Sequence, residues 1–145
     1  MLSRVLGSVL GLLVLAVPTS LATAQGAPVA SGNSALGTIL VDQHGMTLYT
    51  LSSDQPSVST CAGGCLGLWP AATVDDATAD TLRQGAPADW LDLSSFLRDD
   101  GGGNQLTWGG MPLYRFSRDA APGDVTGNGI NAFGGTWAVV QLAGQ

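Results

Sequence analysis

The stretches GMTLYTLSSD (residues 45–54) and GMPLYRFSRD (residues 110–119) decide the expected fold, because they are two copies of one decapeptide. Six of their ten positions are identical, and the copies begin 65 residues apart. The similarity continues downstream, where GLW (residues 67–69) matches GTW (residues 135–137) at a spacing of 68. Each copy is therefore predicted to be a module made of a hairpin, a glycine-rich loop and a tryptophan-bearing segment.

Short apolar runs flank a glycine-containing turn in both modules, which is the usual signature of a β-hairpin. In the first module the expected strands are residues 38–41 and 46–51. In the second, residues 105–108 lead into Gly109-Gly110, a two-residue turn suited to positive φ, and residues 111–116 return.

Other strands are expected where each module ends and in the segment between the modules. Residues 137–142 are predicted to form the final strand, and a weaker strand is expected at Trp69-Pro70. Residues 76–84 are predicted to form a short helix capped by Asp76, and residues 93–98 a strand.

Composition favours sheet over helix throughout the chain. There is no Glu and no Lys, which are strong helix formers, while Gly, Asp, Thr and Ser are abundant and favour turns. The expected fold is a small all-β single domain of two pseudo-repeated β-hairpin modules, sandwich- or barrel-like, with little helix and pseudo-twofold symmetry.

Residues 1–24 have the pattern of a secretory signal peptide. Arg4 provides the positive start, residues 5–17 are an apolar run too short to span a bilayer, and ATA (residues 22–24) is a cleavage site. No cysteine near the cut is available for lipid attachment. The expected protein is exported to the periplasm or the medium, without a membrane span after cleavage.

The expected domain organisation follows from this assignment. Residues 1–24 are a signal peptide, residues 25–36 a flexible leader, and residues 37–145 a two-repeat β domain. The repeats themselves are expected at about 37–74 and 103–142.

The charge of the exported chain is strongly negative. Without Arg4, four arginines stand against eleven acids, all of them Asp, which leaves a net charge of −7. Such a surface repels phosphate backbones, so no nucleic-acid partner is expected.

YRFSRD (residues 114–119), followed by APGDVTGNGINAFGGTWAVV, fits the pattern Tyr-x-aromatic-x-x-Asp. With LYTLSSD…CAGGCLGLWP upstream, the chain from about Gly37 to Leu142 resembles a bacterial family of secreted repeat proteins, predicted lipoproteins with a conserved Yx(FWY)xxD motif. The resemblance implies no established activity. Two departures are that Leu51 replaces the aromatic residue of the first motif and that the lipidation cysteine is absent. The positions that carry the motif are Tyr49, Asp54, Tyr114, Phe116 and Asp119.

Cys61 and Cys65 are the two cysteines of the chain, and in an exported protein a disulfide is the default for such a pair. The glycines between them let the backbone curl enough to close the bridge. The alternative is a thiolate metal site or a redox pair. A redox motif usually has two intervening residues rather than three, and His44 is the further soft ligand available.

Several polar residues allow both a structural and a functional interpretation. His44, the sole histidine, is expected to be an exposed turn residue, with a ligand or base as the alternative. Asp54 and Asp119 are expected to accept backbone N–H groups in turns, because they recur at equivalent places. The alternative is a pair of acids for catalysis or cation binding.

The loop after the second motif resembles the start of a calcium loop. Oxygen-bearing side chains stand at its first, third and fifth positions, but Gly135 stands at the twelfth, where a bidentate Glu is required. A plain glycine-rich loop is therefore favoured over a calcium site, and no metal and no cofactor is expected. The weak calcium candidates are Asp124, Thr126 and Asn128.

No Ser-His-Asp set, phosphate-binding loop or haem-attachment motif is present in the sequence, so an enzyme is not expected. The favoured hypothesis is an exported, non-enzymatic accessory or binding module of the bacterial cell envelope, with an unknown envelope partner or small ligand. The alternative is a cation-binding or redox-linked extracytoplasmic protein that uses Cys61, Cys65 and the Asp-rich loops. The aromatic residues are expected to form either a core or a shallow ligand face, with core favoured for Trp69 and Trp137. Those residues are Tyr49, Tyr114, Phe116, Trp69, Trp137 and Trp108.

Overall fold

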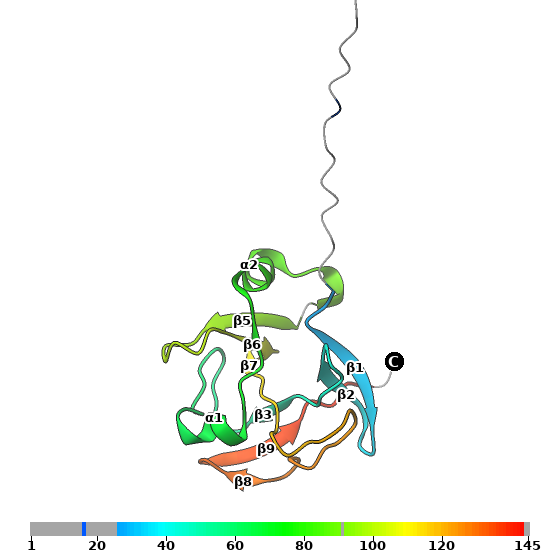
Figure 1. The fold of residues 1–145 in the computed structure, drawn as a ribbon, viewed down its shortest axis with the longest axis vertical. Helices are drawn as coiled ribbons and strands as arrows, with labels where there is room; N and C mark the ends of the chain where they lie inside the picture. Colours follow the sequence, from blue (N-terminus) through cyan, green and yellow to red (C-terminus); the bar gives the residue numbers. More distant parts are fainter. Residues whose placement is uncertain (1–15, 17–25, 91, 144–145) are drawn as a thin grey trace, which may run out of the picture.

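The structure is a computed structural model that describes residue 16 and residues 26–90 and 92–143. The expected signal peptide, residues 1–24, lies outside the described residues except for Ala16. In the described part, short strands dominate and helices are few (Figure 1). The strands are β1 (Val29–Ser34), β2 (Gly37–Asp42), β3 (Tyr49–Leu51), β4 (Thr73–Val74), β5 (Leu93–Leu97), β6 (Asn104–Trp108), β7 (Met111–Pro112), β8 (Asn131–Ala132) and β9 (Gly135–Val139). The helices are α1 (Gly64–Leu68), α2 (Asp76–Gly85) and a short 3-10 helix (Ala88–Trp90).

Each repeat opens with an antiparallel hairpin whose second strand is also paired along its other edge. In the second repeat, β6 pairs with β5 on one edge and with β4 and β7 on the other. In the first repeat, β2 pairs with β1, and its other edge carries the isolated bridges Val41–Thr47 and Ile39–Gln141. The two hairpins therefore have the same surroundings, as a duplicated unit requires.

The two repeats are interleaved rather than placed side by side. Tyr49 and Tyr114 exchange backbone hydrogen bonds of 2.8 and 2.9 Å at the centre of the molecule. β3 of the first repeat pairs with β9 of the second, whereas Ala71 of the first repeat bridges to Tyr114 of the second. The last segment of each repeat thus completes the sheet of the other, with pseudo-twofold symmetry.

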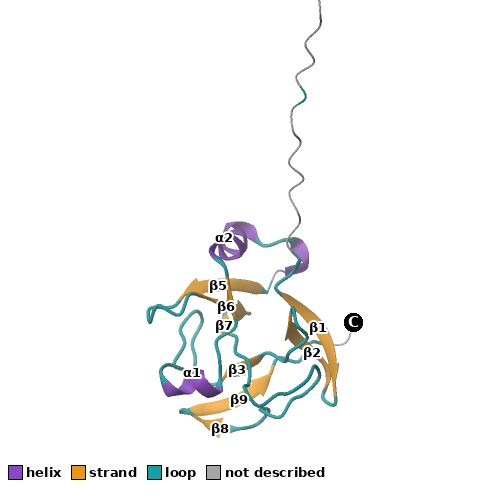
Figure 2. Ribbon diagram, in the orientation of Figure 1, coloured by secondary structure: helices purple, strands orange, loops and turns teal. Residues whose placement is uncertain are grey.

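Strand alternation divides the interior into two hydrophobic clusters. Leu40 and its two neighbours show the division, because Ile39 and Val41 enter a cluster of aromatic residues while Leu40 enters a cluster of aliphatic residues. The aliphatic cluster is covered by α2, which contributes Leu82 (Figure 2). The aromatic cluster consists of Ile39, Val41, Tyr49, Leu51, Cys61, Cys65, Trp69, Tyr114, Phe116, Trp137 and Val139.

The expected final strand, helix and strand at residues 93–98 are present within a few residues of their predicted bounds. The second expected hairpin is present as the pairing of β6 with the short β7. The first is reduced to a short pairing around the Val41–Thr47 bridge, because residues 49–51 pair with β9 instead. The helix cap differs by one residue, because the Asp75 side chain accepts the Thr78 N–H at 2.7 Å and the helix begins at Asp76. The strands of the described residues form sheets of two, three and four strands and do not close into a barrel.

Two expectations were wrong. Residues 25–36 are not a flexible leader, because residues 29–34 form β1, whose small polar side chains are held by backbone pairing to β2. Trp69 is not in a strand, because its N–H closes the end of α1 on the Cys65 carbonyl at 2.8 Å. None of the helices in the described residues is long and apolar enough to cross a membrane.

Candidate functional site

The tyrosine and aspartate of the repeat motif are joined across the repeats. The Tyr49 hydroxyl donates to Asp119 Oδ2 at 2.7 Å, and the Tyr114 hydroxyl donates to Asp54 Oδ2 at 2.7 Å. All four side chains are buried. Each tyrosine therefore donates a hydrogen bond to the aspartate of the other copy. This agrees with the pairing of β3 from the first repeat with β9 from the second.

The other oxygen of each aspartate fixes the loop that follows it. Asp54 Oδ1 accepts the backbone N–H and the hydroxyl of Thr60 at 2.7 and 2.8 Å. Asp119 Oδ1 accepts the same two groups of Thr126 at 3.0 and 2.6 Å. The structure thus places both aspartates in the expected turn role, and adds the tyrosine bond that the sequence did not indicate.

Burial and the adjacent carboxylates hold both tyrosine hydroxyls in their protonated form. Desolvation raises the pKa of Tyr49 well above its ordinary value, and the hydrogen bond to Asp119 raises it further. Desolvation and Asp54 raise the pKa of Tyr114 in the same way. A protonated tyrosine is the donor that a carboxylate acceptor needs, so these pairs are suited to holding the fold together.

The aromatic residues of both repeats stack between the tyrosines. The indoles of Trp69 and Trp137 lie parallel, with ring centroids 3.9 Å apart, and neither is exposed. Each indole meets one tyrosine edge-on, Trp69 with Tyr49 at 5.3 Å and Trp137 with Tyr114 at 5.0 Å. Phe116 stacks on Trp69 at 4.2 Å. These side chains are core and leave no aromatic face to solvent.

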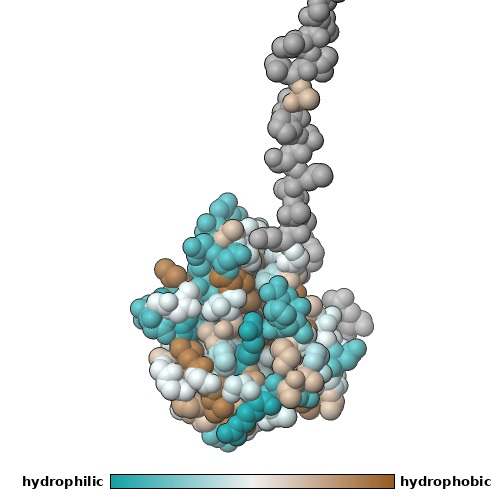
Figure 3. Space-filling model, viewed as in Figure 1, coloured by the Kyte–Doolittle hydropathy of each residue, from teal (hydrophilic) through white to brown (hydrophobic). Residues whose placement is uncertain are grey.

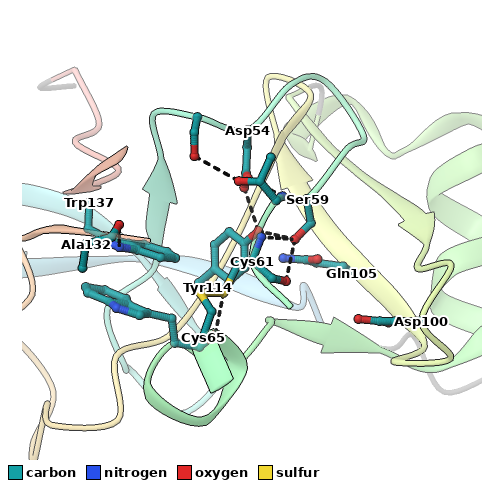
Figure 4. The surroundings of a disulfide bond; sticks show 12 residues. Asp54, Ser59, Cys61, Cys65, Asp100, Gln105, Tyr114, Ala132 and Trp137 are labelled. Atoms are coloured by element: carbon teal, nitrogen blue, oxygen red, sulfur yellow. Dashed lines mark hydrogen bonds between the residues drawn. A yellow bond between two sulfur atoms is a disulfide. The ribbon is translucent and has the colours of Figure 1, made fainter. Parts of the chain in front are cut away.

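Cys61 and Cys65 form the disulfide expected from their spacing, with Cα atoms 5.4 Å apart (Figure 4). The bridge spans the start of α1 and packs in the aromatic cluster beside Tyr114 and Trp137. Cys61 is 0% and Cys65 4% exposed. A thiolate metal site or an exchanging redox pair needs accessible sulfur, so this burial favours the structural interpretation.

A buried arginine ties the disulfide loop to the second hairpin. Arg98 donates to the Cys61 carbonyl at 2.9 Å, to Ser59 at 3.0 Å and to Gln105. Its outer edge meets Asp100 at 2.6 Å, and this guanidinium lowers the pKa of Asp100 to about 2. The charge of Arg98 is therefore satisfied inside the fold.

His44 lies in the turn after β2, and its side chain is 69% exposed. It donates its backbone N–H to Asp42 Oδ1 at 2.8 Å, as does Met46 at 3.0 Å. Asp42 Oδ2 lies 2.7 Å from Arg115 Nε. Asp42, not His44, therefore organises this turn.

The candidates for a calcium loop are used for hydrogen bonds within the chain. Asp124 Oδ2 accepts the N–H groups of Ala120 and Ala121 at 2.9 and 3.0 Å, and Thr126 is bound to Asp119. Asn128 Oδ1 accepts the Val139 N–H at 3.1 Å. Each of the three oxygen donors is thus engaged by a group of the chain itself, and in the described residues no three Asp, Cys or His side chains gather around one point.

An apolar groove of about 730 Å³ opens beside the aliphatic cluster, and we call it the tryptophan groove. The 3-10 helix that carries Trp90 lies next to the start of β1 (Figure 2). Two hydroxyls, of Ser31 and Thr38, also line it. Its main lining side chains are Val29, Leu40, Leu142, Trp90, Trp108 and Asp92.

A second hollow of about 500 Å³, the Arg115 hollow, has a different lining. It contains the Asp42–Arg115 ion pair and the exposed Asp75. Leu106 and Val74 supply its apolar wall.

The two hollows occupy equivalent places in the two repeats. Leu40 donates its N–H to the Val140 carbonyl at 2.9 Å, and Leu106 donates to the Ala72 carbonyl at 2.8 Å. Leu40 and Leu106 are thus equivalent, and two residues further along their strands stand Asp42 and Trp108. One hollow therefore has an ion pair where the equivalent hollow of the other repeat has tryptophan.

Sequence reasoning identified Trp108 as core or ligand face but missed its partners. Trp90 and Asp92 lie in the segment between the modules, where no repeat marks them. The Asp42–Arg115 pair was also missed, since it joins residues 73 positions apart in different repeats. The sequence did offer one signal for this hollow, which is that Trp108 has no tryptophan counterpart in the first repeat. The equivalent position there is the polar Asp42.

Comparison with known proteins gives one result. A family model described as a secreted repeat of unknown function matches residues 30–73 and 95–141. The matches begin inside β1 and β5, earlier than the expected repeat starts at 37 and 103, because each repeat includes the first strand of its hairpin. No curated protein and no solved structure matches the chain.

Proposed function

The chain belongs to this family of secreted repeats, and from that premise we propose that it is an exported, non-enzymatic binding module of the bacterial cell envelope. The family fits an exported protein. The proposed step is that the molecule acts by binding a small ligand or an envelope partner in the tryptophan groove.

The observation that carries this proposal is the lining of the groove. Small-molecule sites are typically concave, about 300–1,000 Å³, mostly apolar and aromatic, with a few polar groups that orient the ligand. The tryptophan groove, at about 730 Å³, has two half-buried indoles, aliphatic walls and a few oxygen-bearing side chains. The fully buried Trp69 and Trp137 show that the fold has room for indoles in its core, so the partial exposure of Trp90 and Trp108 is a distinct feature.

The non-enzymatic character is supported by the way the reactive groups are used. The motif aspartates and tyrosines bind one another in the core, and the cysteines are joined in a buried bridge. His44 is exposed in a turn and faces Asp42 at 4.0 Å without lining the groove. The groove therefore offers contacts suited to recognition, and the motif offers contacts suited to stability.

The proposal is tested by NMR on protein purified from the exported fraction. Its four tryptophans give four indole N–H signals, which are assigned with single variants. Titration with benzyl alcohol, a small neutral aromatic probe, is expected to shift the signals of Trp90 and Trp108 and leave those of Trp69 and Trp137 in place.

A Trp108→Leu variant is the control, and it should weaken binding of the probe while the protein remains folded. Shifts confined to surfaces away from the groove, or no saturable shift with benzyl alcohol, would refute the assignment of the site. Turnover of a substrate by the purified protein would refute the non-enzymatic part.

A further inference from the structure

The tryptophan groove carries one negative charge that none of the described arginines neutralises. Among the described residues that line it, Asp92 is the charged one, and its exposed carboxylate makes no ion pair with the described arginines. The other polar lining groups are the hydroxyls of Ser31 and Thr38. The whole chain is also acidic, with a formal net charge of −6. The electrostatic character of the groove is therefore that of a cation acceptor.

Backbone hydrogen bonding places Asp92 beside the end of the strand that carries Trp108, and both residues line the groove. The Gly109 N–H donates to the Asp92 carbonyl at 2.8 Å, and the following residue, Leu93, pairs with Trp108 across β5 and β6. Leu93 is buried in the aliphatic cluster, against which Trp108 also packs. The acid therefore lies in the turn just before β5, and the indole lies on the neighbouring strand β6.

The Arg115 hollow, the equivalent hollow of the other repeat, has an acid where the tryptophan groove has Trp108. There the buried Asp42 is paired with a cation of the chain itself, Arg115, at 2.7 Å. The first repeat has Thr50 at the position of Arg115 in the aligned decapeptides, so it sends no guanidinium toward the tryptophan groove. One hollow contains its own cation, whereas the described lining of the other has indoles and a carboxylate without an arginine.

We propose that the tryptophan groove binds a small organic cation, of the quaternary ammonium or alkylamine class, between the indoles of Trp90 and Trp108 and the carboxylate of Asp92. This inference rests on the proposed function, because it assumes that the groove is a binding site. An indole attracts a cation through the negative face of its ring and is the best of the aromatic side chains for this purpose. Alkyl groups on the nitrogen would contact the walls formed by Leu40 and Leu142.

The test compares choline with 3,3-dimethyl-1-butanol, a neutral molecule of the same shape, on the protein purified from the exported fraction. The indole signals of Trp90 and Trp108 are followed by NMR, and the affinity is measured by calorimetry. We expect choline to bind about fivefold or more tightly than the neutral isostere, as a cation–π contribution requires. Raising the salt concentration should weaken choline binding and leave the isostere unaffected.

Two charge variants form a matched pair for this test. Asp92→Asn removes the carboxylate of the groove and is expected to weaken choline binding about threefold. Asp75→Asn removes an exposed carboxylate from the Arg115 hollow, keeps the helix cap because Asn also caps helices, and should leave the affinity unchanged.

The outcomes separate this inference from the proposed function. Equal binding of choline and its isostere, insensitive to Asp92→Asn, would overturn the cation assignment while the groove would stand as a binding site. Binding of benzyl alcohol at Trp90 and Trp108, without any binding of choline, would likewise overturn the cation assignment and leave the groove as a binding site. If none of the three probes moved these indole signals, both proposals would fall.

Discussion

The tyrosine and the aspartate of the repeated decapeptide occur in both repeats, and each tyrosine binds the aspartate of the other repeat. The Tyr114 hydroxyl binds Asp54, and the Tyr49 hydroxyl binds Asp119. A hydrogen bond to a buried carboxylate contributes about 1.5–3 kcal/mol, more than a neutral pair. In this chain the repeated tyrosine and aspartate therefore join the two copies, which explains why both residues occur in each copy.

Double-mutant cycles test this exchange directly. Tyr114→Phe removes the hydroxyl, leaves a buried acceptor on Asp54 with one donor fewer, and should lower the free energy of unfolding by about 1–3 kcal/mol. Combined with Asp54→Asn, it should show a coupling energy of about 1–2 kcal/mol, measured by urea denaturation.

The control for that cycle combines the tyrosine and aspartate substitutions within one repeat. Tyr114→Phe with Asp119→Asn should be additive within about 0.5 kcal/mol, because no hydrogen bond joins Tyr114 to Asp119. A larger coupling within the repeat than across the repeats would contradict the exchanged pairing.

Gly127 shows that a glycine in a loop can be required for packing. A Cβ at this position would lie 2.6 Å from Trp69 Cη2 and 3.0 Å from Phe116 Cδ1, and neither ring can move without disturbing the stack. Gly127→Ala is therefore expected to destabilise the protein by about 1–3 kcal/mol, measured by thermal or urea unfolding.

Gly67→Ala is the matched substitution, because a Cβ there meets nothing within 4 Å and the residue lies in α1. Since alanine favours helix, this variant should be neutral or slightly more stable. Equal losses for the two variants would show that crowding against Trp69 is not the cause.

At the scale of the elements, the sequence was a good guide wherever apolar residues alternate around a glycine turn. The strand at residues 37–42 was predictable from its run of Ile39, Leu40 and Val41. β1 was not, because VASGNS has little side-chain signal and is held by backbone hydrogen bonds to β2. The pairing of β3 with β9 was also beyond prediction, since two similar copies do not reveal which copy completes which sheet.

The candidate site was predictable to a smaller extent than the fold. The disulfide followed from two cysteines in an exported chain, and the motif residues followed from the repeat. Trp90 and Asp92 stand outside both repeats, so only the tertiary fold brings them to Trp108. A groove made by residues that differ between the copies leaves no pattern in a self-comparison.

The disulfide closes the turn that starts α1. A disulfide that closes so short a loop stabilises the folded protein by about 2 kcal/mol in the chain-entropy model. Cys61→Ala/Cys65→Ala should therefore lower the free energy of unfolding by about that amount, measured by urea denaturation, and fold to the same structure. Because both cysteines are buried, reductant should leave the bridge of the folded protein intact, as judged by alkylation and mass spectrometry.

The double alanine variant also serves as the control for reduction in denaturant. Reductant should lower the stability of the bridged protein to that of the variant and leave the variant unchanged. Rapid reduction of the folded protein would mean that the sulfurs are accessible, and the redox interpretation would then regain support.

At the scale of the whole molecule, the interleaving of the repeats makes them one folding unit. The face shown in Figure 3 mixes hydrophilic and hydrophobic groups without one extended apolar area, as expected if each repeat buries its apolar side in the other. A repeat on its own would lose the partner of its central tyrosine, the stack of Trp69 on Trp137 and one edge of its sheet. Neither repeat can therefore keep the native core by itself.

Cutting the chain between the repeats tests this conclusion. A protease site inserted after α2, next to the exposed Pro87, would separate the repeats without touching a described strand. The disulfide lies within the first repeat, so no covalent bond would join the two pieces. We expect the nicked protein to remain a one-to-one complex with native circular dichroism on size-exclusion chromatography, since each piece still completes the sheet of the other. Separated in urea and refolded alone, each piece should lack the near-ultraviolet signal of the stacked indoles, and mixing should restore it. Pieces that refold independently with that signal would show that the repeats are separate units, and the exchanged pairing would then be unnecessary for the fold.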